Sequence, residues 1–265
     1  EDGIRDSSTS RGLGDVYKRQ LVEFFKETQE IITDRGVLKF RVDSPGSVPQ
    51  DPKSNRSEPE TFEWIRTTLK DQEVLWDIGA NIGVFSLYAA LEKKNKVLSL
   101  EPSAESYATL NANIRLNGLD EYIQALCFAG SNTTNLLNLF MKDTSAGASH
   151  NSIGSSSNQF GEFDVNGFQS VIAIKLDDLN QIEGVPSPNH IKLDVDGKEL
   201  EILEGASNIL SGINSILVEM EGINLDENLE KIENIISMAG LEEELSWRNK
   251  GSRRNRLYLR KYSNE

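Results

Sequence analysis

The stretch Glu73-Val74-Leu75-Trp76-Asp77-Ile78-Gly79-Ala80-Asn81-Ile82-Gly83 decides the fold of this 265-residue chain. Its first six residues are almost continuously apolar, which is typical of a parallel strand that is buried on both faces of a sheet. The glycines that follow predict a tight turn, and the apolar run from Val84 to Leu91 predicts a helix directly after it. Ligands of α/β sheets bind at the ends of such strands, so we expect a binding site at this turn.

Strands and helices alternate through the rest of the chain. Before the glycine turn, 21–42 predicts a short helix and then a strand at 36–42, and another helix is expected from Ser57, with Pro59 in its first turn. Further strands are expected at 96–100, 122–128, 136–141, 170–176, 189–195 and 215–220, and further helices at 103–116, 198–210 and 229–239. A terminal hairpin is expected at 242–247 and 256–261. This order predicts an α/β fold whose mostly parallel sheet carries helices on both faces.

Composition divides the chain into segments. Residues 1–20 are rich in Ser, Gly, Arg and Asp, and 15–20 resembles the translation of a sequencing-library adapter. We therefore expect a read-through artefact or disorder there, with the natural N-terminus missing, and exclude this segment from the fold. Residues 21–72 are interpreted as an N-terminal appendage and 73–262 as the main domain. Within that domain, the Ser-, Asn- and Gly-rich segment 130–168 is interpreted as a lid or an insertion.

The chain is strongly acidic. It has 28 Lys and Arg against 42 Asp and Glu, which gives a formal net charge of −14. Such a surface repels phosphate backbones, so we expect no nucleic-acid partner. No run approaches the ~18 apolar residues of a membrane span, so no membrane association is expected. The single cysteine, Cys127, excludes an internal disulfide and a Cys-based metal site, which fits a cytoplasmic protein.

A local basic stretch stands out against this acidity near the C-terminus. It consists of Arg253, Arg254, Arg256, Arg260 and Lys261. We interpret it as the solvated face of a strand in preference to an anion-binding patch.

The glycine turn lacks the dinucleotide fingerprint Gly-x-Gly-x-x-Gly. It has Gly-x-Asn-x-Gly after Asp77, whose carboxylate would repel a diphosphate and suits a cationic ligand. Glu101 ends the next strand, 22 residues after Gly79, where it is able to accept hydrogen bonds from both ribose hydroxyls. An adenosine with a positively charged amino-acid tail meets these demands, so we expect S-adenosylmethionine at Asp77, Gly79, Gly83 and Glu101. Taken singly, Asp77 would be interpreted as a helix cap and Glu101 as a solvated strand end.

A second group of charged residues falls at the later strand ends. Lys192 and Asp194 share one strand face, and Glu219 ends the following strand. Methyl transfer to a hydroxyl needs a general base, for which Asp194, Glu219 and His150 are candidates, with Lys192 beside them. Two plainer interpretations stay open, in which Lys192 and Asp194 form a structural ion pair and His150 is an exposed loop histidine. The acids are also able to hold a divalent metal, but we do not expect one and assign no metal ligands.

Several blocks match one family in order and spacing. They are Glu58-Pro59-Glu60-Thr61, Trp64-Ile65, Asp77 to Gly83, Leu100-Glu101-Pro102-Ser103, Leu176-Asp177-Asp178-Leu179, Ile191-Lys192-Leu193-Asp194-Val195-Asp196-Gly197 and Val218-Glu219. On these blocks, which cover roughly 57–222, the chain resembles the FkbM-type methyltransferase family. One position departs from the family pattern, because Asp196 stands where the family usually has glutamate. The charge is kept, but the side chain is shorter.

The resemblance implies a Rossmann-like class I methyltransferase with a seven-stranded sheet whose last two strands form a reversed, antiparallel hairpin. It implies O-methylation of a hydroxyl in a sugar, a glycan or a secondary metabolite. It also implies cofactor contacts at Asp77, Gly79, Ala80, Asn81, Gly83, Glu101 and Pro102. The sequence indicates neither the particular acceptor nor the oligomeric state.

The residues also bear on three alternative functions. A nicotinamide-dependent oxidoreductase is disfavoured by the missing fingerprint and by Asp77. A base-directed nucleic-acid methyltransferase is disfavoured by the negative charge and by the absence of a Pro-Pro motif. A binding module that keeps the cofactor pocket without catalysis remains open.

Overall fold

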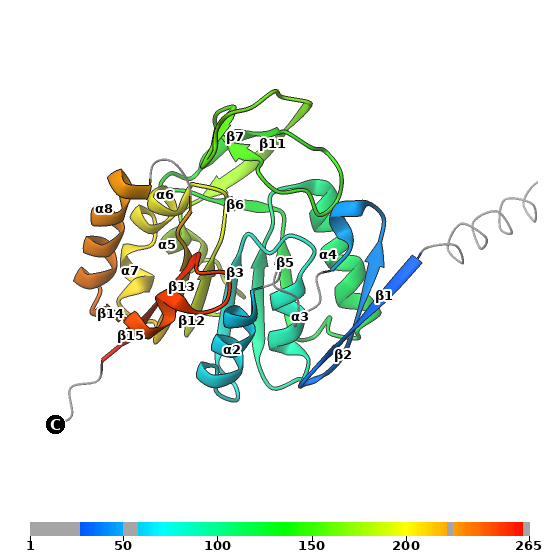
Figure 1. The fold of residues 1–265 in the computed structure, drawn as a ribbon, viewed down its shortest axis with the longest axis horizontal. Coiled ribbons are helices and arrows are strands. Elements are labelled where there is room, and N and C mark those ends of the chain that lie inside the picture. The colour runs from blue at the N-terminus through cyan, green and yellow to red at the C-terminus, as the bar shows by residue number, and fades with distance from the viewer. Residues whose placement is uncertain (1–26, 50–57, 222–224, 262–265) are drawn as a thin grey trace, which may run out of the picture.

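A seven-stranded sheet forms the centre of the computed structural model, which describes residues 27–49, 58–221 and 225–261 (Figure 1). Its strand order is β14-β15-β13-β12-β3-β4-β5. The bounds are Val74–Ile78 for β3, Lys96–Leu100 for β4, Ile123–Leu126 for β5, His190–Leu193 for β12, Ser215–Glu219 for β13, Leu241–Glu243 for β14 and Asn255–Arg260 for β15. All neighbouring pairs are parallel except those made by β15, which runs against β13 and β14. The predicted Rossmann-like, mostly parallel sheet with a C-terminal antiparallel hairpin is therefore confirmed.

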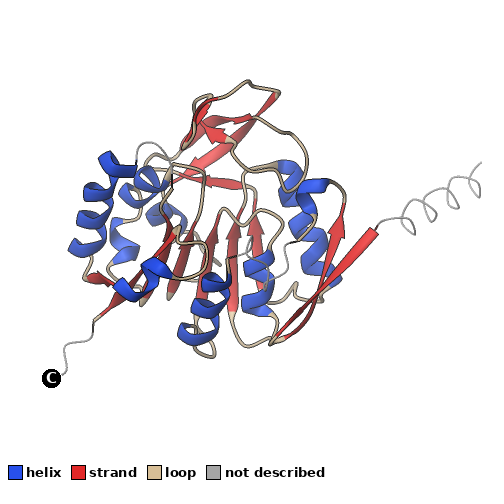
Figure 2. Cartoon of the chain, in the orientation of Figure 1, coloured by secondary structure: helices blue, strands red, loops and turns tan. Residues whose placement is uncertain are grey.

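Helices cover both faces of this sheet (Figure 2). On one face, the core contains side chains from α2 (Pro59–Thr68), α3 (Val84–Ala90) and α4 (Ala104–Leu116). On the other face, it contains side chains from α5 (Leu176–Leu179), α6 (Glu199–Glu204), α7 (Ser207–Leu210) and α8 (Leu225–Met238). Adjacent residues of β3 alternate between the two cores, because Leu75 packs with the first set and Trp76 with the second. A strand buried on both faces explains the continuous apolar run in the sequence.

The N-terminal part of the described chain is an antiparallel hairpin. Strands β1 (Glu27–Thr33) and β2 (Gly36–Val42) pair with each other, and a short 3-10 helix follows at Pro45–Ser47. The strand predicted at 36–42 is confirmed, whereas the helix predicted before it is wrong from Glu27 onward, where the chain is extended. The helix predicted to start near Ser57 begins at Pro59, and its cap position is Glu58. Ser57 lies outside the described residues, as does the segment 1–20.

A second, smaller sheet lies above the carboxyl ends of the central strands (Figure 1). Its order is β6-β11-β7-β8, with bounds Phe128–Gly130 for β6, Asn135–Met141 for β7, Ser152–Ile153 for β8 and Gly167–Ile174 for β11. A separate short pair is formed by β9 (Ser157–Asn158) and β10 (Gly161–Glu162). Two predictions need correction here. The strand expected at 122–128 divides between the two sheets, and the strand expected at 170–176 belongs to the small sheet.

Two other elements also differ from the prediction. The helix expected at 198–210 is split into α6 and α7, because the chain bends at Gly205, where a Cβ would overlap the carbonyl oxygen of Ser131. Between the two hairpin strands, Leu245–Asn249 forms a 3-10 helix in place of the expected strand end.

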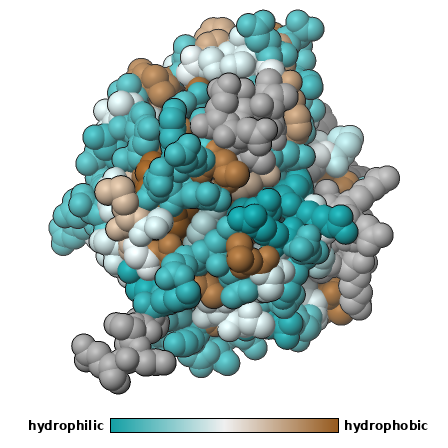
Figure 3. Space-filling model, turned by 60° about the vertical axis from the view of Figure 1, so that its left-hand side comes forward, coloured by the Kyte–Doolittle hydropathy of each residue, from teal (hydrophilic) through white to brown (hydrophobic). Residues whose placement is uncertain are grey.

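The surface is largely polar. On the face drawn in Figure 3 hydrophilic side chains predominate and apolar ones form small patches, as expected for a chain with a net charge of −14. Among the residues that the structure describes, no helix has the length and apolar character required to cross a membrane.

Candidate active site

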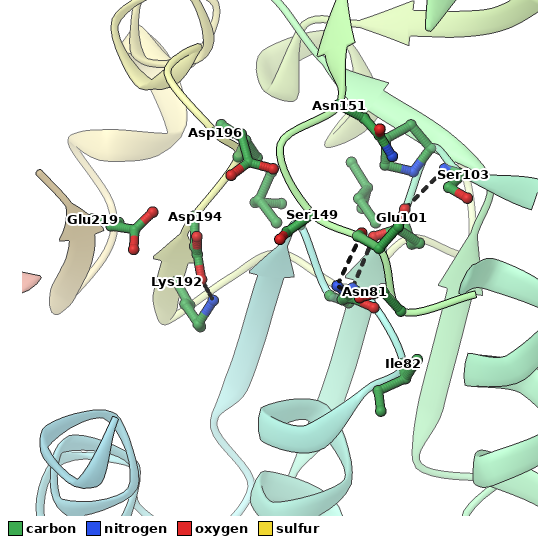
Figure 4. A pocket seen from close by; sticks show the side chains of 18 of the residues that line it. Asn81, Ile82, Glu101, Ser103, Ser149, Asn151, Lys192, Asp194, Asp196 and Glu219 are labelled. Atoms are coloured by element: carbon green, nitrogen blue, oxygen red, sulfur yellow. Dashed lines mark hydrogen bonds and ion pairs between the residues drawn. The ribbon is translucent and has the colours of Figure 1, made fainter. Parts of the chain in front are cut away.

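A cavity of about 420 Å³ opens at the carboxyl ends of the central strands and is lined on its other side by residues of the small sheet. The glycine turn, the end of β4 and the loop at 147–151 line one part of it, and the ends of β12 and β13 line another. In Figure 4, Asn81 and Glu101 lie on one side and Lys192, Asp194 and Glu219 on the other, with Ser149 between them. The two groups of charged residues predicted from sequence therefore share one cavity.

The glycine turn is shaped by left-handed backbone conformations. Gly79 has φ +84° and lies so close to the end of β12 that a Cβ would overlap the carbonyl oxygen of Asp194. Gly83 has φ +93° and would clash with the side chain of Leu110 in the same way. Between them, Asn81 has φ 51°. A side chain at Gly79 would therefore push the turn away from the end of β12, and one at Gly83 would displace Leu110 of α4.

Glu101 is fixed by this turn. Its Oε2 accepts a hydrogen bond from the backbone N–H of Asn81 at 2.8 Å, and its Oε1 accepts one from the N–H of Ser103 at 2.8 Å. The side chain is only 7% exposed, and burial raises the pKa of Glu101 to about 7. Each carboxylate oxygen keeps a second lone-pair position, so Glu101 remains able to accept hydrogen bonds from a ligand.

Asn81 connects the turn to the loop above it. Its Nδ2 donates to the carbonyl oxygens of Gly147 and Ala148 at 3.4 and 3.5 Å. Its Oδ1 is buried and has no hydrogen-bond partner among the described residues, although Asn81 lines the cavity. A buried acceptor without a partner is costly, so a donor group on a ligand would fit there.

Asp77 lies behind the wall of the cavity. It is 1% exposed and accepts a hydrogen bond from the hydroxyl of Ser86 at 2.5 Å, and its Oδ1 is 3.9 Å from Nζ of Lys192. Burial raises the pKa of Asp77. Of the predicted cofactor residues, the structure places Gly79, Ala80, Asn81, Glu101 and Pro102 at the cavity and places Asp77 and Gly83 beneath it.

Lys192 is the buried cation of the site. Its Nζ donates to Oδ2 of Asp194 at 2.8 Å and lies 5.0 Å from the centre of the Phe85 ring. Burial alone would lower the pKa of Lys192, but the charges of Asp194, Asp77 and Glu58 outweigh it and raise the pKa. The predicted ion pair between Lys192 and Asp194 is present, and it forms part of the cavity wall.

Glu219 lies beside this ion pair. Burial and the negative charge of Asp194 raise the pKa of Glu219 to about 10. Burial would also raise the pKa of Asp194, but the charge of Lys192 and hydrogen bonds from Glu219 and Lys192 lower it. At neutral pH, the structure therefore holds a proton on Glu219 and a negative charge on Asp194.

Glu58 and Arg254 complete this cluster, and neither was identified from the sequence. Nη1 of Arg254 contacts Oε1 of Glu219 at 2.9 Å, and Nη2 contacts Oε1 of Glu58 at 3.1 Å. The interpretation of the basic stretch as a solvated face is thus wrong for Arg254. It is also wrong for Arg260, whose guanidinium donates to three backbone carbonyls. Glu58 belongs to one of the blocks that resemble the family, but the sequence indicated only that a helix begins there.

The three acids of the cluster are close enough together to bind one metal ion. One carboxylate oxygen from each of Glu58, Asp194 and Glu219 lies within 4.8 Å of the others. Lys192 and Arg254 already contact these oxygens, and with Glu219 protonated their two positive charges balance those of Glu58 and Asp194. We assign no metal ligands.

His150 lies in the loop over the cavity, and it is bound to Asp196. Its backbone N–H donates to Oδ2 of Asp196 at 2.6 Å, and its ring Nδ1 lies 3.2 Å from Oδ1. The hydrogen bond to Asp196 raises the pKa of His150. The other histidine, His190, is buried at the amino end of β12, where it contacts Ser215 and Glu73. His150 lines the cavity, whereas His190 is structural.

This fold and this cavity define a class of protein, a Rossmann-like methyltransferase. The family model described as the methyltransferase FkbM domain matches residues 77–252, and the chain belongs to this family. It is 26% identical over 192 residues to the hexuronic acid methyltransferase AglP of Haloferax volcanii, which is 72% of each chain.

Two solved structures show a weaker similarity. Methyltransferase FkbM from Methylobacillus flagellatus KT is 20% identical with a TM-score of 0.49, over 73% of this chain and 46% of the other, so this chain spans less than half of that one. Precorrin-6y C5,15-methyltransferase from Geobacter metallireducens GS-15 is 16% identical with a TM-score of 0.40, over 70% of this chain and 71% of the other. The fold assignment rests on the strand order of this chain.

Proposed function

We propose that this protein transfers a methyl group from S-adenosylmethionine to a hydroxyl oxygen of a sugar, either in a glycan or in a secondary metabolite. The observation that carries the proposal is the buried carboxylate of Glu101. Backbone hydrogen bonds fix it beside a glycine turn that lacks the features of a diphosphate site. Such a carboxylate suits the two hydroxyls of a ribose.

The residues of the turn fit this cofactor. The glycine positions allow close approach of a ligand to the backbone, and the Oδ1 of Asn81 offers an acceptor that lacks a partner. Gly79, Ala80, Asn81, Glu101 and Pro102 would hold the nucleoside and its tail, while Asp77 would act from behind through its negative charge. When bound, S-adenosylmethionine supplies an electrophilic methyl group on a sulfonium.

The other half of the cavity suits a polyhydroxylated acceptor. Asp194, Glu58 and Arg254 offer charged acceptors and donors, which bind hydroxyl groups through strong hydrogen bonds. The name of the relative, a hexuronic acid methyltransferase, supports a sugar as the acceptor. The candidates for the base that removes the hydroxyl proton are His150, Asp194 and Glu219. The segment 130–168 fits the role of a lid that selects the acceptor, and 73–262 that of the methyltransferase domain.

The two remaining alternatives make different predictions. A nicotinamide-dependent oxidoreductase would bind a dinucleotide in place of S-adenosylhomocysteine in a calorimetric titration. A binding module would bind S-adenosylhomocysteine but transfer no methyl group.

The decisive experiment is methyl transfer from S-adenosylmethionine labelled with deuterium in the methyl group. We expect label in at least one member of a panel of neutral and hexuronate-containing oligosaccharides, detected by mass spectrometry. A methyl ether survives mild alkali, whereas a methyl ester is hydrolysed. Label that is lost in alkali would show a carboxylate acceptor and overturn the assignment to a hydroxyl. Absence of label from the whole panel would favour the binding module.

A further inference from the structure

A histidine and an aspartate from distant parts of the chain form a dyad over the cavity. His150 comes from the loop that precedes β8, and Asp196 from the turn between β12 and α6. We propose that His150, oriented by Asp196, is the general base that removes the proton from the acceptor hydroxyl. This inference rests on the proposed function and identifies the group that the chemistry of that function requires.

The geometry of the dyad orients the imidazole. Asp196 binds His150 twice, through the backbone N–H at 2.6 Å and through ring Nδ1 at 3.2 Å. A carboxylate is an acceptor, so this arrangement favours the proton on Nδ1 and leaves the lone pair of Nε2 for a substrate. The same relation between an acid and a histidine orients the base in hydrolytic triads.

Both residues of the dyad have unusual backbone conformations. His150 has φ 67° and Asp196 has φ 58°, in the left-handed region that non-glycine residues rarely adopt. Such conformations cost free energy and persist where the surrounding structure imposes them, often at functional sites. Two separate segments thus adopt unfavourable conformations at the point where they meet over the cavity.

The segment 158–160 holds the dyad in place from the other side. Nδ2 of Asn158 donates to the carbonyl oxygen of His150 at 2.7 Å, and the ring of Phe160 meets the imidazole edge-on at 4.9 Å. Gly197 passes so close to Gln159 that a Cβ would lie 2.9 Å from its backbone nitrogen. The position of His150 is therefore fixed by contacts on its backbone, its ring and its partner.

The other candidate bases are already engaged. Asp194 forms an ion pair with Lys192 at 2.8 Å, and its lowered pKa makes it a weak base. Glu219, with a pKa of about 10, already carries a proton at neutral pH and therefore cannot accept one from the acceptor hydroxyl. Glu58 is bound by Thr61, Asn255 and Arg254. Among the candidates in the described part of the chain, His150 is the one whose deprotonated side chain still has an acceptor atom, Nε2, that Asp196 does not engage.

The proposed step balances in atoms and charge. The acceptor O–H bond breaks and its proton moves to Nε2 of His150, while the acceptor oxygen forms a bond to the methyl carbon. The bond between that carbon and sulfur breaks, and its electron pair stays on sulfur. A neutral thioether, a methyl ether and an imidazolium result. The positive charge moves from the sulfonium to His150, where the carboxylate of Asp196 stabilises it.

The charged groups around His150 determine the pH at which it acts. The hydrogen bond to Asp196 raises its pKa, burial and Lys142 lower it, and Glu221 raises it, with a net upward shift. The base must be neutral to accept a proton. The methylation rate should therefore increase with pH through a value above the ordinary 6.5 of histidine and then level off.

The first test replaces the imidazole and then restores it. His150→Gly suits the left-handed backbone at this position and leaves space where the ring was. We expect kcat on the labelled saccharide to fall roughly 100-fold or more, the Kd for S-adenosylhomocysteine to stay within about threefold, and added imidazole to restore part of the rate. Asp164→Asn changes an exposed side chain between β10 and β11 and keeps His150 with all its contacts, so it should retain most of its rate and show no response to imidazole.

The second test needs no acceptor. The chain has two histidines, so nitrogen-15 NMR of the imidazoles resolves His150, and comparison with His150→Gly assigns it. We expect the neutral ring to carry its proton on Nδ1. Asp196→Asn should lower the pKa of His150, move the pH profile of the rate in the same direction and lower kcat. Asp196→Glu, which keeps the charge, should restore both.

The outcomes separate this inference from the proposed function. A proton on Nε2 in the neutral ring, or a kcat for His150→Gly near that of the wild type, would overturn the assignment of the base while methyl transfer itself stands. Methyl transfer to no saccharide by the wild type would overturn the proposed function, and the inference with it.

Discussion

Glu101 has a carboxylate that is held ready for a ligand before the ligand binds. Replacing it with glutamine would turn an NH₂ group toward one of the two backbone N–H donors, at Asn81 or Ser103, and remove the charge. We expect Glu101→Gln to weaken S-adenosylhomocysteine binding roughly 10- to 100-fold, the effect of about 1.5–3 kcal/mol for a hydrogen bond to a charged group. Calorimetry measures this, with Glu105→Gln in the exposed first turn of α4 as the control. Equal affinities of the two variants would contradict the role of Glu101.

Asp77 has two buried partners that the sequence analysis did not identify. It faces Lys192 and Ser86 beneath the cavity, so its removal leaves a buried ammonium with less compensating charge. We expect Asp77→Asn to lower the free energy of unfolding by about 2 kcal/mol and to weaken cofactor binding by a smaller amount. Urea unfolding and calorimetry on the same preparation compare the two effects. Unchanged stability with lost binding would instead support direct contact between Asp77 and the cofactor.

The charged half of the cavity shows which residues a sequence can reveal. Lys192, Asp194 and Glu219 were found because strand periodicity brings them to neighbouring strand ends. Arg254 was missed because its partners, Glu58 and Glu219, lie 196 and 35 positions away in the chain. Local patterns carry no information about such distant pairs, and an arginine on a strand near the C-terminus looks the same whether its guanidinium meets water or an acid.

At the scale of elements, the glycine turn depends on close packing between the ends of β3 and β12. The stability cost of this close packing can be measured by comparing two glycines, because Gly79 (φ +84°) and Gly118 (φ +62°) are both left-handed. A Cβ at Gly79 would overlap the carbonyl oxygen of Asp194, whereas a Cβ at Gly118 would meet nothing within 4 Å. We expect Gly118→Ala to cost about 1–2 kcal/mol of stability through backbone strain alone, and Gly79→Ala to cost clearly more. Urea midpoints measure both losses of stability. Equal losses would show that the chain around Gly79 shifts to accommodate the added methyl group at no extra cost.

The elements that the sequence misplaced share a physical cause. The apolar segments at 122–128 and 170–176 have strand character, but hydrophobic pattern does not specify which sheet a strand joins. In the structure, β6 and β11 pair with each other in the small sheet. The segment 198–210 likewise has apolar residues at helical spacing, but the break at Gly205 depends on a contact with Ser131 across the fold. The central strands were predicted well because a strand buried on two faces has a continuous apolar sequence.

At the scale of the whole molecule, the buried acids make stability depend on pH. Burial raises the pKa of Glu101 and of Glu199 to about 7, and that of Glu219, also exposed to the charge of Asp194, to about 10. In the unfolded chain, these groups return to about 4.5. Between these values the folded protein binds more protons than the unfolded one. These groups therefore contribute most to stability below about pH 4.5, and their contribution falls as the pH rises toward 7.

We therefore expect the ligand-free protein to unfold at a lower urea concentration at pH 7.5 than at pH 5.5. Each raised acid contributes up to about 1.4 kcal/mol per pH unit in this range, and the high negative charge of the chain acts in the same direction. His190, whose pKa burial lowers, opposes the trend below 6.5, but it is one group against several. Glu199→Gln should make the dependence shallower, because the Oε1 of glutamine still accepts hydrogen bonds from the N–H groups of Val195 and Gly197 but glutamine does not titrate. Stability that increases from pH 5.5 to 7.5 would show that these acids are ionised in the folded protein, and that Glu101 presents a permanent charge to its ligand.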